Sequence, residues 1–246
     1  MTSFDACAVV PVYEHERSVG GVVAGLRAAG LHCYLVDDGS GSNCAARLDA
    51  IAAGDPDVTL LRLARNSGKG AAVTAGLRAA ASAGRTHAMQ IDADGQHDAA
   101  DIDRFLDEAR KDPDALVCGR PVFDDDMPVA RRYGRYLTHG MVWLNTLSLD
   151  IPDAMCGFRV YPLAPVLALL DEATLGSRMD FDVELMVRLH WRGVPMRWLD
   201  TRVVYPSDGV SHFRPWTDNF RITAMHTRLF FGMLARLPAL LVRSSA

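Results

Sequence analysis

The chain has 246 residues, 49% of them hydrophobic, which suits one α/β domain with a substantial core rather than two domains. Its formal net charge is -4 and its lysines and arginines are spread along the chain, so charge gives no reason to expect nucleic acid as a partner. Five cysteines without a CxxC pair argue against a zinc site and against a secreted disulfide framework.

The N-terminus lacks a basic segment before its first apolar run, which argues against a secretory signal peptide. No stretch reaches the roughly 18 uncharged apolar residues that a membrane-spanning helix needs. We therefore expect a cytoplasmic protein that contacts a membrane only from the side, as a peripheral protein on the cytoplasmic face.

The first half of the chain alternates short β-branched apolar runs with Ala-rich amphipathic stretches, the pattern of a parallel sheet covered by helices. Strands are predicted at Ala6 to Val12, His32 to Val36, Val58 to Leu63, Ala88 to Ile91 and Ala115 to Cys118. Helices are predicted at Val19 to Ala29, Ala45 to Ala53, Gly70 to Ala83 and Asp101 to Arg110.

The second half is less regular. An acidic loop is predicted from Pro121 to Pro128, then a helix from Arg131 to Leu149, then a loop that holds Cys156 to Arg159. No repeat or Gly/Ser linker separates the two halves, so we expect residues 1–210 to form one unit, with 1–119 and 120–210 as its halves and 211–246 as a C-terminal helical segment.

Polar clusters follow the predicted strands, where open α/β sheets gather their ligands. The first cluster is Pro11 to Glu16 and the second is Asp37 to Ser40, whose carboxylates could accept hydrogen bonds from a base or a ribose. Each is also compatible with an ordinary turn that carries an Asp N-cap.

A third cluster, Arg65 to Gly70, enters an Ala-rich helix, so backbone N–H groups and Lys69 could face a phosphate. The cluster has neither the spacing of a Walker loop nor the GxGxxG of a dinucleotide fold. The ATPase and dehydrogenase classes therefore lose their main support.

The fourth cluster is Asp92 to His97, directly after an apolar strand. Alternate carboxylates in a turning segment can point toward one hard divalent cation, and Mg²⁺ or Mn²⁺ typically takes one or two carboxylates plus substrate phosphates. The alternative is an Asp-rich turn that starts a helix.

Taken together, these motifs resemble the family 2 glycosyltransferases of GT-A fold, and within them the dolichol- and polyprenyl-phosphate sugar synthases. The resemblance runs from about Ala6 to Tyr205. Its pieces, in order, are PVYEHE (11–16), VDDGS (36–40), NSGKG (66–70), DADGQH (92–97), CGFRVY (156–161) and MDFDVELMVRLHWRG (179–193).

The resemblance implies an inverting transfer from a UDP- or GDP-sugar with Mg²⁺ or Mn²⁺, on a mainly parallel, Rossmann-related sheet. The residues implied on the nucleotide side are Pro11, Tyr13, Glu14, Asp38 and Lys69. The residues implied for metal and diphosphate are Asp92, Asp94 and Gln96, and those implied for a donor or acceptor phosphate are Arg159 and Arg131 or Arg132. Glu14-His15 departs from the Asn-Glu that more often follows the tyrosine in this family.

The acids Asp180, Asp182 and Glu184 leave two classes of acceptor possible, a phosphate and a hydroxyl. A phosphate acceptor is already ionised near pH 7, whereas a hydroxyl acceptor usually needs a carboxylate to take its proton, with Asp182 or Asp180 favoured here. On a helix Asp180 and Glu184 share a face and Asp182 points roughly opposite. The alternative is that all three are helix N-terminal acids stabilised by the macrodipole.

A basic amphipathic helix is predicted from about Trp216 to Leu237, with Pro238 ending it and an apolar tail after it. It could lie in an anionic membrane surface, or dock on the core or on a second subunit, which leaves a homo-oligomer open. His212, before this helix, could cap the donor site or be structural.

We expect a lipid-linked or amphipathic acceptor, a polyprenyl phosphate first. One alternative is the hydroxyl of a lipid or of an aryl-polyene-type pigment. Another, from a different class, is a non-catalytic nucleotide-sugar-binding membrane adaptor, which loss of the metal ligands would support. The chain lacks the Gly-rich loop that follows the first strand of a sugar nucleotidyltransferase, because Pro11-Val12-Tyr13 occupies that place.

Overall fold

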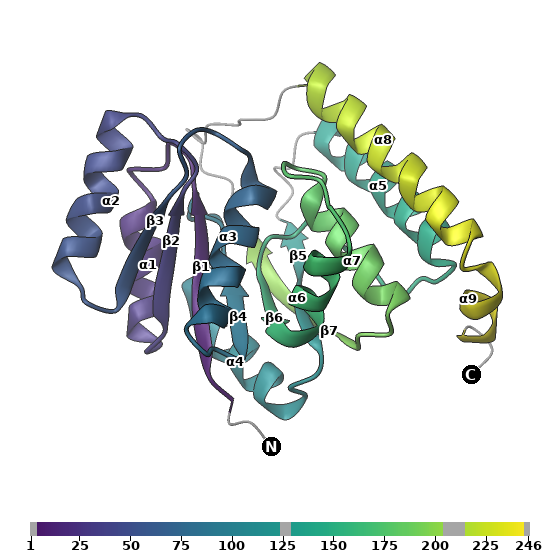
Figure 1. The fold of residues 1–246 in the computed structure, drawn as a ribbon, viewed down its shortest axis with the longest axis horizontal. Coiled ribbons are helices and arrows are strands. Elements are labelled where there is room, and N and C mark those ends of the chain that lie inside the picture. Colours follow the sequence, from purple (N-terminus) through teal and green to yellow (C-terminus); the bar gives the residue numbers. More distant parts are fainter. Residues whose placement is uncertain (1–3, 124–128, 204–214, 244–246) are drawn as a thin grey trace.

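The structure is a computed structural model that describes residues 4–123, 129–203 and 215–243. Its centre is a seven-stranded sheet of order β3-β2-β1-β4-β6-β5-β7 (Figure 1). The strands are β1 Ala6–Val12, β2 His32–Asp37, β3 Val58–Arg62, β4 His87–Gln90, β5 Leu116–Phe123, β6 Arg159–Pro162 and β7 Met196–Val203. Among the strands that the structure describes, β6 alone runs antiparallel to its neighbours, so the mainly parallel α/β sheet expected from the sequence is confirmed.

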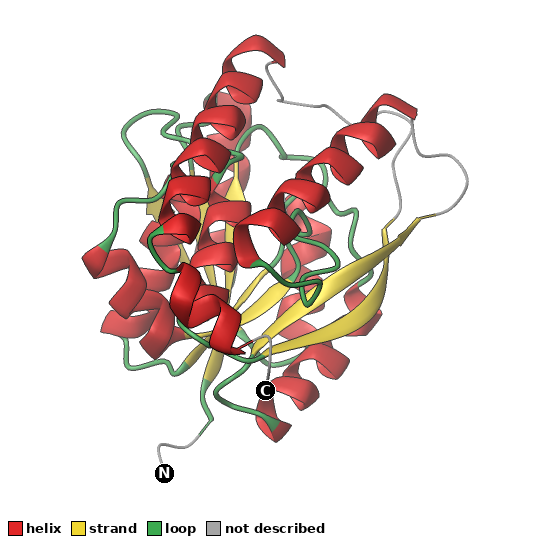
Figure 2. Ribbon diagram, turned by 90° about the vertical axis from the view of Figure 1, so that its right-hand side faces the viewer, coloured by secondary structure: helices red, strands yellow, loops and turns green. Residues whose placement is uncertain are grey.

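Helices pack on both faces of this sheet (Figures 1 and 2). The helices are α1 Val19–Ala28, α2 Ser42–Gly54, α3 Lys69–Ser82, α4 Ile102–Lys111, α5 Val129–Thr146, α6 Leu163–Glu172, α7 Phe181–Trp191, α8 Pro215–Leu234 and α9 Leu237–Arg243. Alternate residues of β1 enter two separate cores: Cys7 and Val9 join the core under α3, α6 and α7, while Ala8 and Val10 join the core under α1, α2 and α4.

The second half of the chain corrects two expectations. Pro121 to Phe123 belong to β5 rather than to an acidic loop. Past Cys118 the described part of β5 pairs with β7 and no longer with β6, so fewer of its backbone N–H groups are needed as hydrogen-bond donors and a proline is tolerated there. The C-terminal helix ends before Pro238, and the expected tail is the separate helix α9, with Pro238 in its first turn, where a missing N–H costs nothing.

Helix α8 packs against α5 and α7, and it fully buries Met225 and Leu229. Its other side leaves Trp216, Phe220 and Phe231 exposed by 91%, 76% and 64%. The helix is therefore part of the core on one side and presents aromatic surface on the other. Within the described residues, no helix has the length and apolar character needed to cross a bilayer.

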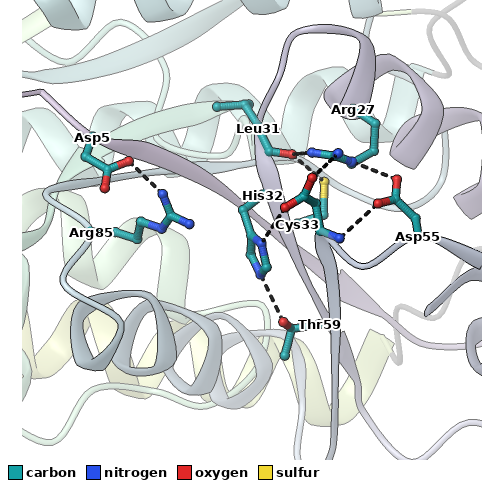
Figure 3. Close-up of polar contacts among 9 residues, drawn as sticks. Asp5, Arg27, Leu31, His32, Cys33, Asp55, Thr59 and Arg85 are labelled. Carbon is teal, nitrogen blue, oxygen red and sulfur yellow. Dashed lines mark hydrogen bonds and ion pairs between the residues drawn. The ribbon is translucent and has the colours of Figure 1, made fainter. Parts of the chain in front are cut away.

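A polar network ties together the amino-terminal ends of the strands, at the edge opposite the carboxyl ends (Figure 3). Arg27 at the end of α1 donates to Asp55 at 2.8 Å and to the carbonyl of Leu31 at 2.7 Å. Arg85 pairs with Asp5 at 2.7 Å just before β4 and β1. These ion pairs hold the scaffold and leave the carboxyl edge for ligands.

Candidate active site

Three of the sequence motifs meet at the carboxyl edge of the sheet through Lys69. The Lys69 ammonium, on the first residue of α3, lies 2.7 Å from Asp92 Oδ1 and 2.9 Å from Asp182 Oδ2. Asp92 follows β4, and Asp182 is in the first turn of α7. Residues far apart in sequence thus form one partly buried cluster, which we call the Lys69 cluster: Lys69, Asp92 and Asp182.

Within the Lys69 cluster, the electrostatics of Lys69 and Asp92 favour the charged form of both groups. Burial alone would lower the pKa of Lys69, but the charges of Asp182 and Asp92 outweigh it and raise that pKa above its usual range. Burial opposes ionisation of Asp92, and Lys69 reverses the effect, so the pKa of Asp92 lies below its usual range. Lys69 and Asp92 therefore form a charged pair at the carboxyl edge of the sheet.

Asp94, two residues after Asp92, has less positive charge nearby to offset its burial. Its Oδ1 accepts the Gln96 backbone N–H at 3.0 Å, and burial together with the nearby charge of Asp92 raises its pKa. Asp92 and Asp94 stand two residues apart in the turn after β4, and carboxylate oxygens are the ligands that a hard divalent cation prefers. In the described ranges no three His, Cys, Asp or Glu side chains gather into a complete metal site, so substrate oxygens would have to supply the other ligands.

Gly157 presses directly against Asp92. A Cβ placed on Gly157 would overlap the Asp92 carboxylate, so any larger residue there would displace it. The loop before Gly157 is fixed by Asp153, which accepts the backbone N–H of Cys156 at 2.8 Å and is paired with Arg135 of α5. Sequence reasoning missed this support; the glycine in CGFRVY was the available signal.

Beneath Asp182 lies a second layer of polar side chains. Arg159 is completely buried, donates to the Asp182 carbonyl at 3.0 Å and places its Nη1 3.6 Å from Asp182 Oδ1. Gln90 donates to the same carboxylate at 3.3 Å and accepts from Tyr161 at 2.9 Å. Arg159 therefore supports Asp182 in this structure and does not face an open site where a phosphate could bind.

The three acids of α7 separate as helical spacing predicts, with Asp182 facing Lys69. Glu184 is fully buried and accepts from the Gly176 N–H at 2.9 Å, from Arg188 at 2.8 Å and from Arg228 at 3.1 Å. Asp180, the N-cap residue, accepts the Arg178 N–H at 3.1 Å. Glu184 thus joins α7, α8 and the preceding loop.

Asp38 and Glu14, the acids expected on the nucleotide side, join neighbouring loops through hydrogen bonds. Asp38 is buried after β2 and accepts the backbone N–H groups of Ser67 and Gly68 at 2.6 and 2.8 Å. Burial raises the pKa of Asp38, with those hydrogen bonds opposing the shift. Glu14 accepts the Gly41 N–H at 2.6 Å. The loops after β1, β2 and β3 are therefore held side by side.

Pro11 and Tyr13 complete the nucleotide-side set at this edge. Pro11 lies near the end of β1, paired in register with Val36 of β2, and Tyr13 follows the strand with its side chain half-buried. Both therefore border the same loops as Asp38 and Glu14.

The loop before α7 covers the NSGKG segment. Arg178 donates to Asn66 Oδ1 at 2.8 Å, and Ser177 accepts the Ala71 N–H at 3.0 Å. A Cβ on Gly68 or Gly70 would collide with this loop, and Gly68 has a φ of 103°, which favours glycine. Sequence reasoning missed Arg178, although the paired glycines marked a close approach.

Three expected residues cannot be placed. Arg131 and Arg132 lie in the first turns of α5, where the described residues give backbone without side-chain positions. His212 falls in 204–214, outside the described residues.

Comparisons with known proteins agree with this arrangement. Residues 7–167 match the sequence profile described as glycosyl transferase family 2. A polyprenol monophosphomannose synthase of Mycolicibacterium smegmatis is 26% identical, over 76% of this chain and 71% of the relative. An undecaprenyl-phosphate mannosyltransferase of Micrococcus luteus is 27% identical, over 73% and 75%. A dolichyl-phosphate beta-glucosyltransferase of Dictyostelium discoideum is 28% identical, over 66% of this chain and 51% of its own length.

The fold also matches solved structures. The glucosyl-3-phosphoglycerate synthase of Mycobacterium tuberculosis in complex with Mn²⁺ and UDP-glucose superposes with a TM-score of 0.66 at 15% identity, over 95% of this chain and 79% of that one. At that identity the likeness speaks for the fold, which is GT-A. Because the family profile covers well over half of the chain, this protein belongs to the family 2 glycosyltransferases.

Proposed function

We propose that this glycosyltransferase moves a sugar, with inversion and with Mg²⁺ or Mn²⁺, from a UDP- or GDP-sugar to a polyprenyl phosphate or another lipid-linked acceptor. The observation that carries the proposal is the Lys69 cluster, which joins Asp92 and Asp182 at the carboxyl edge of the sheet. That edge is where α/β sheets bind their ligands.

On the donor side, Asp92, Asp94 and Gln96 would hold the cation together with the diphosphate of the sugar donor. When bound, such a cation acts as a Lewis acid that stabilises charge on the departing diphosphate by several kcal/mol. Lys69 adds a fixed positive charge beside that leaving group. The Mn²⁺ and UDP-glucose in the Mycobacterium tuberculosis structure support this assignment.

On the acceptor side, the names of the Mycolicibacterium and Micrococcus relatives support a polyprenyl phosphate. An ionised phosphate oxygen needs no general base. Asp182 is then a positioning residue for Lys69, since its carboxylate contacts Lys69, Gln90 and Arg159. A hydroxyl acceptor would instead require Asp182 or Asp180 to accept a proton.

The domain plan expected from the sequence stays part of the proposal: a nucleotide-sugar half (1–119), an acceptor half (120–210) and a C-terminal segment (211–246). We place the protein peripherally on the cytoplasmic face of a membrane. The exposed aromatic side chains of α8 support that position, because aromatic side chains favour the membrane interface. The same surface could join two copies of the chain.

A transfer assay tests the proposal. The full chain is incubated with Mn²⁺, a panel of UDP- and GDP-sugars, and farnesyl phosphate or farnesol, and the product is identified by mass spectrometry. We expect transfer to farnesyl phosphate. Asp182→Asn should keep the rate of this transfer within about tenfold of wild type, because no proton is removed from a phosphate acceptor. A product on farnesol that Asp182→Asn abolishes would point to the hydroxyl alternative, and turnover with neither acceptor would contradict both.

A further inference from the structure

A pocket lies between α8 and the loop before α7, and its two arginines, Arg221 and Arg228, have been given no part in substrate binding so far. It is lined by Thr174, Leu175, Gly176, Ser177 and Asp180 of the loop before α7 and its N-cap, and by Arg221 and Arg228 of α8. We propose that this pocket binds the phosphate of the lipid-linked acceptor. This inference rests on the proposed function and names a subsite within it.

The donor set of the pocket suits a phosphate. Arg221 projects from α8 and has no ion-pair or hydrogen-bond partner among the residues that the structure describes. Arg228 contacts Glu184 at 3.1 Å through one nitrogen and is about half exposed. Thr174 and Ser177, which carry hydroxyl groups, also line the pocket. Guanidinium groups match phosphate oxygens in geometry and charge.

The acidic side chains at the pocket are held by the protein. Asp180 is buried and turned back onto its own loop, where it accepts the Arg178 N–H. Glu184 lies fully buried behind Arg228, with its oxygens taken by Gly176, Arg188 and Arg228. The exposed part of the lining is therefore positive.

The pocket is also beside the donor site. The loop that carries Ser177 lies directly on the NSGKG segment, where Ser177 accepts the Ala71 N–H and Arg178 contacts Asn66. Lys69 is in that segment, so one short loop separates the pocket from the Lys69 cluster. Exposed aromatic residues on α8, Trp216 and Phe220, precede Arg221 in the same helix and could meet the prenyl chain.

Binding of farnesyl phosphate to the full chain, followed by calorimetry, tests the pocket. Arg221→Gln should weaken binding about 10- to 100-fold, the range for losing a hydrogen bond to a charged group. Arg236→Gln, an equal loss of charge beyond the end of α8, should leave binding unchanged within about twofold. Equal affinity in wild type and Arg221→Gln, or an equal loss in Arg236→Gln, overturns the proposal.

Two further probes separate the sources of phosphate. Inorganic phosphate should bind more weakly than farnesyl phosphate and with the same dependence on Arg221. Phosphatidylglycerol vesicles should not displace farnesyl phosphate; displacement that depends on Arg221 would assign the pocket to bilayer headgroups instead. Farnesyl phosphate that binds through Arg221 without any sugar transfer would refute the proposed function while the pocket stands. Transfer with an unchanged KM in Arg221→Gln would refute the pocket alone.

Discussion

At the scale of single residues, acids with similar sequence surroundings have different environments. Asp182 faces Lys69 across the active site, whereas Glu184, two positions on, is enclosed by Arg188, Arg228 and the Gly176 N–H. The separation follows from helical geometry, in which alternate residues point to different sides. Their substitution should therefore have different effects.

Glu184→Ala should lower the free energy of unfolding by about 2–3 kcal/mol, because it leaves a buried N–H and two arginines without their acceptor. Urea denaturation measures the loss. Glu172→Ala, which removes an exposed partner of Arg192, should change stability by no more than about 1 kcal/mol. If Glu184→Ala were as stable as wild type but inactive, Glu184 would be catalytic rather than structural.

Gly157 offers a second residue-scale prediction. Gly157→Ala should weaken metal-dependent nucleotide binding about 10- to 100-fold, since its Cβ would displace the Asp92 carboxylate. Gly140→Ala is the matched control: it lies in α5 with open space around it and should raise stability by about 0.5–1 kcal/mol. Normal nucleotide affinity in Gly157→Ala would show that Asp92 need not be held in place.

At the scale of elements, the sequence predicted the first half well, and in the second half it predicted the helices that became α5 and α8 but gave no bounds for β6, α6 and β7. The strands at Ala6–Val12 and His32–Asp37 have buried apolar runs long enough to identify them. The four-residue strand β6 has no such length, and its charged Arg159 is buried only because Asp182 and the Ala154 carbonyl receive it. That pairing joins distant parts of the chain and cannot be seen in local pattern.

The active site shows the same limit. Alternate carboxylates directly after an apolar strand predict the motif around Asp92, but its contacts with Lys69 and Asp182 depend on how α3 and α7 pack. The direction of Arg159, toward the protein interior, likewise depends on packing.

The contact between α5 and α8 predicts a pH effect. His226 of α8 is buried against Asn145 of α5, and burial lowers its pKa to about 4. Because folding lowers its pKa, His226 does not reduce the free energy of unfolding above about pH 6.5. As the pH falls from about 6.5 toward 4, the unfolded state takes up the proton first, so the free energy of unfolding decreases progressively. We expect a loss of about 1–2 kcal/mol between about pH 7.5 and about pH 5.

Urea denaturation at the two pH values measures this effect. His226→Gln removes the titrating group, so the difference in stability between the two pH values should shrink. His32→Gln, at the amino-terminal edge of the sheet, should keep it. An identical pH dependence in wild type and His226→Gln would assign the effect to other groups.

At the scale of the whole molecule, α8 has both a core side and an exposed aromatic side. Deleting the helix would remove Met225 and Leu229 from the core, so the deletion would confuse folding with membrane binding. Substituting the exposed Trp216, Phe220 and Phe231 by serine isolates the surface. We expect this triple variant to lose most of its association with anionic liposomes in a sedimentation assay and to keep its affinity for nucleotide.

Serine substitution of Leu144, in the last turn of α5, and Leu149, just after that helix, provides the control and should leave liposome association largely intact, since both are exposed apolar residues away from α8's aromatic set. Unchanged association in the triple variant would direct the aromatic surface toward a second protein copy instead. Sedimentation equilibrium would then show whether the same variant dissociates a dimer.

The central claim is that the carboxyl edge of the sheet binds a nucleotide diphosphate through a cation held by Asp92 and Asp94. Calorimetric titration with UDP and with GDP, each with and without Mn²⁺, tests it without any acceptor, using wild type and Asp94→Ala. We predict that one nucleotide binds only with Mn²⁺ and that Asp94→Ala loses this dependence together with most of the affinity. Binding that is equal with and without Mn²⁺, or unchanged in Asp94→Ala, would contradict the claim.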